Sequence, residues 1–225
     1  MCVSFQTATP HQVTHHFKAP LPDSADWKAE AWQDYAAPII VADQHGRQGL
    51  IAQYSMIPKN HIPPGVKRFS TMNARAETIA TLRSYARPWR DGQLCLVPMM
   101  AYFEPNYESG KAQRWRIGMA DGDPFAVAGL YRSWQEPDGQ QSFSFTQITI
   151  NADEHPVMNR FHKPGDEKRS LVVIPEGRYD DWLNCRNPEL AKTFLLPYPP
   201  ALFDVGEVQK DSAKSAAVMF NGELF

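Results

Sequence analysis

The second half of the chain carries the clearest pattern, because its hydrophobic and polar positions alternate with the two-residue period of β-strands. Turn sequences at Asp121-Gly122-Asp123-Pro124 and Pro137-Asp138-Gly139 separate the stretches that show it. The pattern predicts strands over the ranges 94–103, 113–119, 125–134 and 142–151. Strands connected in this order form a meander, so we expect an antiparallel sheet that curls into a barrel.

The other predicted elements are short and flank this sheet. Strands are expected at 38–41, 50–54 and 171–174, and helices at 10–17, 76–87, 179–185 and 188–195. Thr9 and Asn187 each precede a proline, the arrangement of an N-cap residue followed by proline at the first helical position. The helix predicted at 76–87 stops before Pro88. The fold class is therefore expected to be α+β, mainly antiparallel β.

The composition is that of a globular protein. Apolar residues make up 43% and aromatic residues 12% of the 225 residues, and the formal net charge is −2. No apolar run is long enough to span a membrane, and no apolar stretch follows a basic one at the N-terminus. We expect a cytoplasmic monomer with a single domain over residues 1–210 and a small, polar tail at 211–225.

Cys2 has the most distinctive chemistry in the chain. Removal of Met1 would leave a cysteine with both a thiol and a free α-amine, whose pKa values are roughly 8.5 and roughly 8. The amine can condense with an aldehyde to an imine, and the adjacent thiol can then close a thiazolidine ring. Taken alone, Cys2 is more simply a small residue after the start codon. Cys95 and Cys185 add no disulfide or zinc pattern, so we expect no metal and no cofactor.

A basic stretch runs from Lys67 to Arg90, and Asn73 and Arg75 lie within it. These residues are two apart, so on an extended segment their side chains lie on the same face. Arginine holds phosphate through paired hydrogen bonds, and Arg83 adds positive charge to the same region. The stretch predicts an anion-binding patch, although a solvated helix with scattered charges is the simpler explanation when it is taken alone.

Glu104 and His162 are the candidate acid/base residues. Glu104 comes at the end of an apolar strand, where a partly desolvated carboxylate suits general acid/base catalysis, unless it simply faces solvent in a hairpin. His162 lies in a loop beside a strand and could transfer protons near neutral pH, although a lone histidine is more often structural. His155 is the alternative, but it precedes Pro156 and lies farther from the later strand.

In combination these features resemble the SOS response-associated peptidase family, from Met1-Cys2 to roughly Pro200. The most specific match is Asn73-Ala74-Arg75-Ala76-Glu77-Thr78, against the family's Asn-Ala-Arg-x-Glu-Thr. The stretch from Gly92 to Pro98, then Phe103-Glu104, then Asn151-Ala152-Asp153 leading to His162 match in the same order. The resemblance implies a mainly β, barrel-like domain with flanking helices.

The resemblance also implies covalent capture of abasic sites in single-stranded DNA through Cys2, in a protein that is at the nucleoid when it acts on DNA. The family's catalytic positions fall on Cys2, Asn73, Glu104 and His162. Its DNA-binding positions fall on Arg75, Arg83, Tyr54 and Arg169. An autopeptidase activity that removes Met1 and a lyase-type activity on DNA are further implications, although a housekeeping aminopeptidase could also remove Met1.

The sequence departs from the family where DNA would be gripped. Ser4 stands where an arginine is usual, Asn60 where a tryptophan is usual, and Tyr54 where the family has another tryptophan. Other functions therefore stay open. One alternative is an N-terminal-nucleophile amidohydrolase or cysteine peptidase, in which Cys2 attacks an amide. Another is a non-catalytic binder of single-stranded DNA that uses the basic patch and the aromatic residues.

Overall fold

The computed structural model describes residues 3–208, so Cys2 and the tail predicted at 211–225 lie outside the described part. The strands are β1 (Ser4–Thr7), β2 (Glu30–Ala31), β3 (Ala36–Asp43), β4 (Gly46–Tyr54), β5 (Asn73–Arg75), β6 (Leu94–Asn106), β7 (Gln113–Met119), β8 (Phe125–Gln135), β9 (Gln141–Asn151), β10 (Arg169–Leu171), β11 (Val173–Ile174) and β12 (Phe203–Glu207). The helices are α1 (Pro10–His15), α2 (Ala86–Arg90), α3 (Tyr179–Leu183) and α4 (Pro188–Lys192), with 3-10 turns η1 (Lys59–His61), η2 (Met158–Arg160), η3 (Glu176–Arg178) and η4 (Pro200–Leu202).

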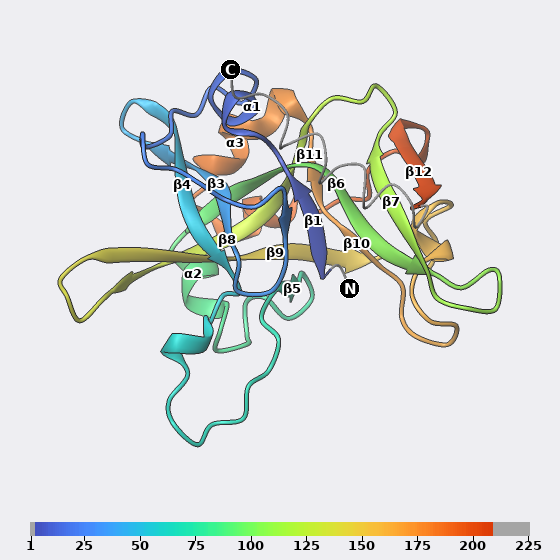
Figure 1. The fold of residues 1–225 in the computed structure, drawn as a ribbon, viewed down its shortest axis with the longest axis horizontal. Coiled ribbons are helices and arrows are strands. Elements are labelled where there is room, and N and C mark those ends of the chain that lie inside the picture. Colours follow the sequence, from blue (N-terminus) through green and yellow to red (C-terminus); the bar gives the residue numbers. More distant parts are fainter. Residues whose placement is uncertain (1–2, 209–225) are drawn as a thin grey trace, which may run out of the picture.

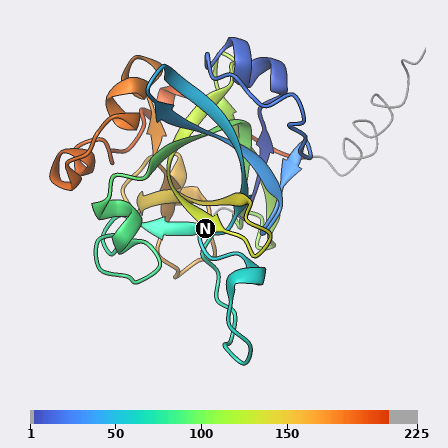
Figure 2. The same cartoon turned by 90° about the vertical axis from the view of Figure 1, so that its left-hand side faces the viewer.

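The sheet closes into a ring. β6 pairs with β8, β8 with β9, β9 with β4, β4 with β3, and β3 returns to β6. Within this ring only the β4–β9 pairing is parallel. Figure 2 shows the strands curving around one centre, with the helices on the outside. The predicted fold, a mainly antiparallel barrel with flanking helices, is confirmed.

Alternation along β9 divides its side chains between two hydrophobic cores. Ile148 and Ile150 pack in the core that includes Trp182 of α3. Phe145 faces the other core, where its ring stacks on Tyr54 with centroids 5.1 Å apart. Phe5 of β1 completes this cluster at 5.3 Å from Tyr54. The side-chain pattern that predicted the strand therefore also fixes which face meets the helices.

The meander prediction is wrong in one respect. β7 pairs with the second half of β6 and with β12, while β8 pairs with the first half of β6. β6 is long enough for both partners, because it runs unbroken from Leu94 to Asn106. The predicted strand at 171–174 is also divided, since Val172 separates β10 from β11. Val172 bonds both neighbouring strands: its N–H donates to Ile148 O, and its carbonyl accepts from Ala128 N.

The helix predicted at 76–87 is wrong as well. The chain forms successive turns there, and the helix α2 begins only at Ala86 and contains Pro88. Ala76 N donates to Thr149 O, so β9 holds the start of this segment in a sheet-like geometry. Pro88 is tolerated because it lies in the first turn of α2, where its missing N–H has no partner to lose.

The predicted helix starts are confirmed. Thr9 Oγ1 accepts from Gln12 N, while Gln12 Oε1 accepts from Thr9 N, which together form a capping box at α1. Asn187 Oδ1 accepts from Glu189 N at the start of α4. Both helices are short, so these caps satisfy a large share of their terminal N–H groups. Among residues 3–208, no helix is long and apolar enough to cross a membrane.

Candidate active site

Glu104 and His162 meet at one end of the barrel. His162 Nε2 lies 3.1 Å from Glu104 Oε2, and both side chains are buried, at 7% and 3% exposed. Glu104 comes from β6 and His162 from the segment after η2. The two groups are joined locally because Asn106 and Phe161 form an isolated antiparallel bridge. A buried carboxylate beside an imidazole is an arrangement that can store and transfer a proton.

The backbone at His162 is strained. Its φ is +66°, in the left-handed region that residues other than glycine seldom occupy. Two hydrogen bonds hold it there: His162 N donates to Pro105 O at 2.9 Å, and Lys168 Nζ donates to His162 O at 3.1 Å. Such strain persists only where the surroundings fix it, and it concentrates at functional sites. The strain therefore favours His162 as a functional residue.

Asn73 is the first residue of β5, which adds to β9 as a parallel neighbour. It pairs with Gln147, its side chain is largely buried, and Tyr85 Oη donates to its carbonyl at 3.2 Å. Burial and strand pairing therefore hold Asn73 in a fixed position. This fits a residue that orients a reactant better than one that contacts solvent.

Tyr54 is wholly buried in the inner aromatic cluster. Its hydroxyl donates to Gln147 Oε1 at 2.8 Å, beside Asn73 in the sheet. Its ring cannot stack on a base from this position, so its burial gives no support to the DNA-binding role expected for Tyr54. The side chain instead links the inner core to the strand pair that carries Asn73.

Arg75 and Arg83 both reach the surface. The Arg75 side chain is 46% exposed, and its Nη1 donates to Glu167 Oε2 at 2.7 Å. Arg83 is exposed and makes no ion pair with any residue from 3 to 208. These are the two predicted DNA-binding residues whose guanidinium groups a phosphate could reach.

Arg169, in contrast, is buried, with only 2% of its side chain exposed. It donates to both oxygens of Glu77 at 2.9 Å, to Glu167 at 2.7 Å and to Thr149 O at 2.7 Å. Burial acts to raise the pKa of Glu77, but the hydrogen bonds and charge of Arg169 outweigh it and leave that pKa below its ordinary value. In this position Arg169 holds the surrounding strands from within and offers no surface to DNA, so its burial gives no support to the DNA-binding role expected for it.

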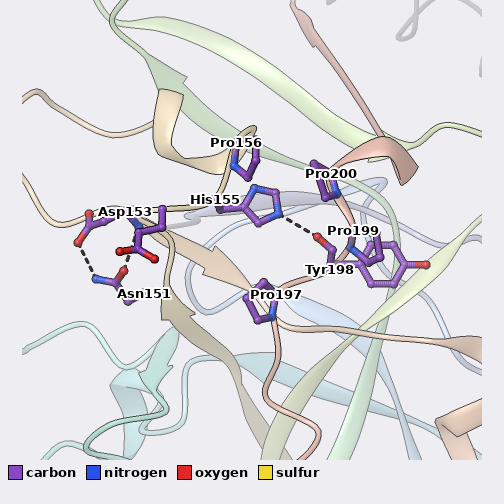
Figure 3. A pocket seen from close by; sticks show the side chains of 9 residues that line it. Asn151, Asp153, His155, Pro156, Pro197, Tyr198, Pro199 and Pro200 are labelled. Carbon is purple, nitrogen blue, oxygen red and sulfur yellow. Dashed lines mark hydrogen bonds between the residues drawn. The ribbon is translucent and has the colours of Figure 1, made fainter.

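His155, the alternative catalytic histidine, is committed to structural hydrogen bonds. Its Nδ1 accepts from the N–H groups of Val157 and Met158, both at 3.1 Å. Because Nδ1 is an acceptor, Nε2 carries the hydrogen and donates to Tyr198 O at 2.9 Å. Figure 3 shows this contact at the wall of a pocket of about 610 Å³, lined by prolines and by Asn151 and Asp153. A ring with both nitrogens used in this way is poorly suited to proton transfer.

Ser4 and Asn60, which stand where the family usually has an arginine and a tryptophan, each lie near a contact made by another residue. Ser4 is buried, and its hydroxyl accepts from Arg114 Nη2 at 3.1 Å, so an arginine from β7 reaches the start of β1. Asn60 is exposed in η1, and its neighbour His61 stacks on Trp134 with ring centroids 3.9 Å apart. The loop after η1 extends away from the barrel (Figure 1). Sequence reasoning missed both contacts, because Arg114 and Trp134 come from strands distant in the chain.

The two described cysteines, Cys95 and Cys185, lie in the interior. Cys95 is fully buried, as expected for a strand residue, and burial raises the pKa of its thiol well above the ordinary value. Cys185 is buried too. No group of three or more His, Cys, Asp or Glu side chains within residues 3–208 is arranged to hold a metal ion. Neither described thiol is therefore placed to act as a nucleophile.

The start of β1 lies at the same end of the barrel as these residues. Ser4 pairs with Phe103, the neighbour of Glu104, and Phe5 packs on Tyr54. The chain segment that leads from Cys2 thus enters the sheet next to Glu104.

The sequence matches a known family. Residues 1–215 match the family described as SOS response associated peptidase (SRAP). Two Bacillus subtilis (strain 168) proteins, named "Abasic site processing protein YobE" and "Abasic site processing protein YoqW", are 31% and 30% identical to the chain over 144 residues. The aligned part covers 61% of this chain with either protein, and 62% of YobE and 61% of YoqW, which is less than two thirds of their length.

Solved structures support the same fold. A crystal structure of a protein from Bordetella bronchiseptica, 32% identical, superposes with a TM-score of 0.82 and covers 92% of this chain and 100% of that chain. A protein from Bacteroides thetaiotaomicron, at 20% identity and a TM-score of 0.74, covers 95% of this chain and 94% of that chain. The second similarity bears on the fold alone.

Proposed function

Because the chain belongs to the SOS response associated peptidase family, we propose that it captures abasic sites in single-stranded DNA by a covalent bond to Cys2 after Met1 is removed. The observation that carries the proposal is the buried Glu104–His162 contact of 3.1 Å, close to where β1 enters the sheet. The names of the Bacillus relatives, abasic site processing proteins, support abasic sites as the target. An abasic site exists partly as an open-chain aldehyde, which is the electrophile that an N-terminal cysteine can trap.

The proposed reaction begins with the sugar ring. His162 takes the proton of the sugar's C1 hydroxyl and returns it to the ring oxygen, which opens the ring to the aldehyde. The Cys2 amine then adds to the aldehyde carbon, and one of its protons moves to the aldehyde oxygen to give a carbinolamine. Glu104 takes the second amine proton and passes it to the departing hydroxyl, so that water leaves and an imine forms. The Cys2 thiol adds to the imine carbon, its proton moves to the nitrogen, and a thiazolidine closes.

Positioning contributes more to this reaction than unusual reactivity, since amines and aldehydes condense readily in water. Asn73 is buried and fixed by the pairing of β5 with β9, so it suits a role in orienting the amine or the thiol. Arg75 and Arg83, which are exposed, contact the phosphates that flank the lesion. Arg169 and Tyr54 act indirectly, by holding the strands that carry these groups.

The proposal is tested by denaturing electrophoresis of Met1-processed protein with single-stranded DNA that carries one abasic site. A thiazolidine survives denaturation without a reductant, so we expect a shifted band that depends on the lesion. Cys2→Ala keeps the α-amine but lacks the thiol, and it should give a band only when borohydride traps the imine. A stable adduct of equal yield from Cys2→Ala would refute the proposal.

The acid/base roles need variants that preserve the backbone. His162→Asn is the suitable change, because asparagine tolerates the left-handed conformation that His162 occupies. Glu104→Gln keeps the size of the side chain and removes its charge. We expect both to slow crosslinking roughly 10²-fold or more, while Met1 removal, read by intact mass, is measured separately. Unchanged rates in both variants, with Cys2 processed, would exclude the proton transfers assigned here.

A further inference from the structure

Glu167 places a carboxylate between two arginines. Its Oε2 accepts from Arg75 Nη1 at 2.7 Å, and its Oε1 accepts from Arg169 Nη1 at 2.7 Å. Asn151 Nδ2 lies 3.3 Å from the same Oε1. Charge-assisted hydrogen bonds from guanidinium groups to an anion's oxygens are also how arginines hold phosphate. Glu167 therefore occupies the position at Arg75 where an external anion would bind.

The two arginines differ in how they depend on Glu167. Arg169 is buried and keeps its paired hydrogen bonds to Glu77 whether or not Glu167 stays in place. Arg75 is half exposed, and Glu167 is its one acidic partner among residues 3–208. Displacement of Glu167 Oε2 would thus free Arg75 for another anion without leaving the buried Arg169 uncompensated.

The loop that carries Glu167 is anchored beside the candidate active site. It follows His162, turns at Gly165 with a φ of +85°, and returns to β10. Lys168 N donates to Asp153 Oδ1 at 2.9 Å, and Lys168 Nζ donates to the carbonyls of His162 and Lys163 at 3.1 Å. The position of Glu167 against Arg75 is therefore set by the fold of the loop as well as by attraction between the two charges.

We propose that Glu167 is an internal competitor for the DNA phosphate at Arg75, and that it limits both the affinity and the salt dependence of DNA binding. The inference rests on the proposed function, since it needs single-stranded DNA as the partner. A phosphate that binds Arg75 through Nη1 must first displace the carboxylate. The ion pair is partly exposed, so its loss should tighten DNA binding by roughly 1.5- to 5-fold.

The test compares Glu167→Gln with Asp166→Asn in the full-length, Met1-processed protein. Both changes remove one negative charge from the same loop, but exposed Asp166 makes no ion pair within residues 3–208, and glutamine keeps an acceptor oxygen for Arg169. Binding of an undamaged single-stranded oligonucleotide is followed by fluorescence anisotropy over a series of salt concentrations. Each variant is also made in the Arg75→Gln background, and its thermal midpoint is recorded.

We expect Glu167→Gln to bind more tightly than Asp166→Asn, and the difference to vanish in the Arg75→Gln background. The slope of log affinity against log salt should also steepen by up to roughly 0.7 in Glu167→Gln, because the phosphate no longer replaces an existing counter-charge. Equal affinities, or a difference that persists without Arg75, would overturn the inference. Failure of every variant to bind DNA would overturn it too.

Crosslinking is measured in parallel so that the two proposals can fail separately. DNA binding without a Cys2-dependent adduct would remove the proposed reaction and leave the competition at Arg75 as measured. An adduct with no difference between Glu167→Gln and Asp166→Asn would keep the reaction and reject the competitor.

Discussion

Replacement of Glu77 by alanine gives a direct test of how the site is braced. Glu77 Oε1 and Oε2 accept from Arg169 Nη1 and Nη2, both at 2.9 Å, in a bidentate pair. Arg169 is 2% exposed, so its guanidinium cannot turn to water when this partner is lost. Glu167 and Thr149 O remain as acceptors, so the buried charge of Arg169 is still partly compensated.

The magnitude follows from these contacts. Hydrogen bonds to charged groups contribute about 1.5–3 kcal/mol in folded proteins. The Glu77 side chain is 50% exposed, so solvent screens part of the interaction and the lower half of this range applies. We expect Glu77→Ala to lower the free energy of unfolding by about 2 kcal/mol, which corresponds to about 4–8 °C in Tm for a domain of this size.

Urea unfolding followed by tryptophan fluorescence measures this change. Glu154→Ala is the matched control, because Glu154 is exposed and makes no ion pair within residues 3–208, and it should stay within about 0.5 kcal/mol of wild type. If Glu77→Ala unfolds at the same urea concentration as Glu154→Ala, the pair with Arg169 does not stabilise the fold, and the bracing role assigned to Arg169 is wrong.

The pH dependence supplies an independent check. Burial acts to raise the pKa of Glu77, but the hydrogen bonds and charge of Arg169 have the larger effect, so the folded-state pKa lies below the ordinary value of 4.5. A carboxylate of this kind contributes stability that is fully present above its unfolded pKa and is lost as the pH falls through its folded pKa. The difference between wild type and Glu77→Ala should therefore be constant above about pH 5.5 and shrink progressively below about pH 4.5.

Three further predictions concern the core. Tyr54→Phe leaves the buried Gln147 Oε1 without its 2.8 Å donor and should lower the free energy of unfolding in urea by about 1–3 kcal/mol. Adding Gln147→Leu to this variant should recover most of the lost stability. Gly129→Ala brings a Cβ to 2.8 Å from Cys95 Sγ in a fully buried setting, so it should lower the free energy of unfolding by about 1–3 kcal/mol and lower Tm accordingly. An unchanged Tm would mean that the strand can shift to make room for the methyl group. Because Cys95 is fully buried and burial raises the pKa of its thiol, this cysteine should react with a thiol reagent at about pH 8 only as the protein unfolds.

The strands could be predicted from the sequence because their signals are local. β7 was predicted at its observed bounds, and β8 and β9 each differ from the prediction by one residue at one end. The pairing of β7 with β12 could not be predicted, because it depends on where a short strand from the end of the domain comes to lie. The pairing of β6 with two partners is likewise a property of the closed sheet, for which a meander pattern holds no information.

The error at 76–87 shows how tertiary contacts override local preference. Ala76, Glu77 and the residues after them have helical composition, but Ala76 N is already bonded to Thr149 O of β9. From there the chain makes successive turns, in which Thr78 N donates to Arg75 O and Thr81 N donates to Thr78 O. Helix propensities of a few tenths of a kcal/mol per residue do not compete with an established sheet contact and a buried Ile79.

The candidate site was predicted in part. Glu104 and His162 were singled out separately and lie in contact, and Arg75 and Arg83 are exposed as a DNA contact requires. The sequence could not show that Arg169 turns inward, because an arginine's environment depends on which carboxylates the fold brings to it. Glu77 is the partner that holds Arg169 inward, and from the sequence it could be identified only as part of the family motif.

The three polar residues of the family motif lie in different environments. Of Asn73, Arg75 and Glu77, the first is buried in the sheet, the second reaches solvent, and the third ties the strand to Arg169 of β10. In the proposed function, this short segment therefore orients a reactant through Asn73, meets a DNA phosphate through Arg75 and is fixed against β10 through Glu77. A reaction that is intrinsically easy gains most from such fixed geometry. The residue types in the motif thus follow from the three environments that β5 and the turn after it pass through: the buried sheet, the surface beside Glu167 and the contact with Arg169.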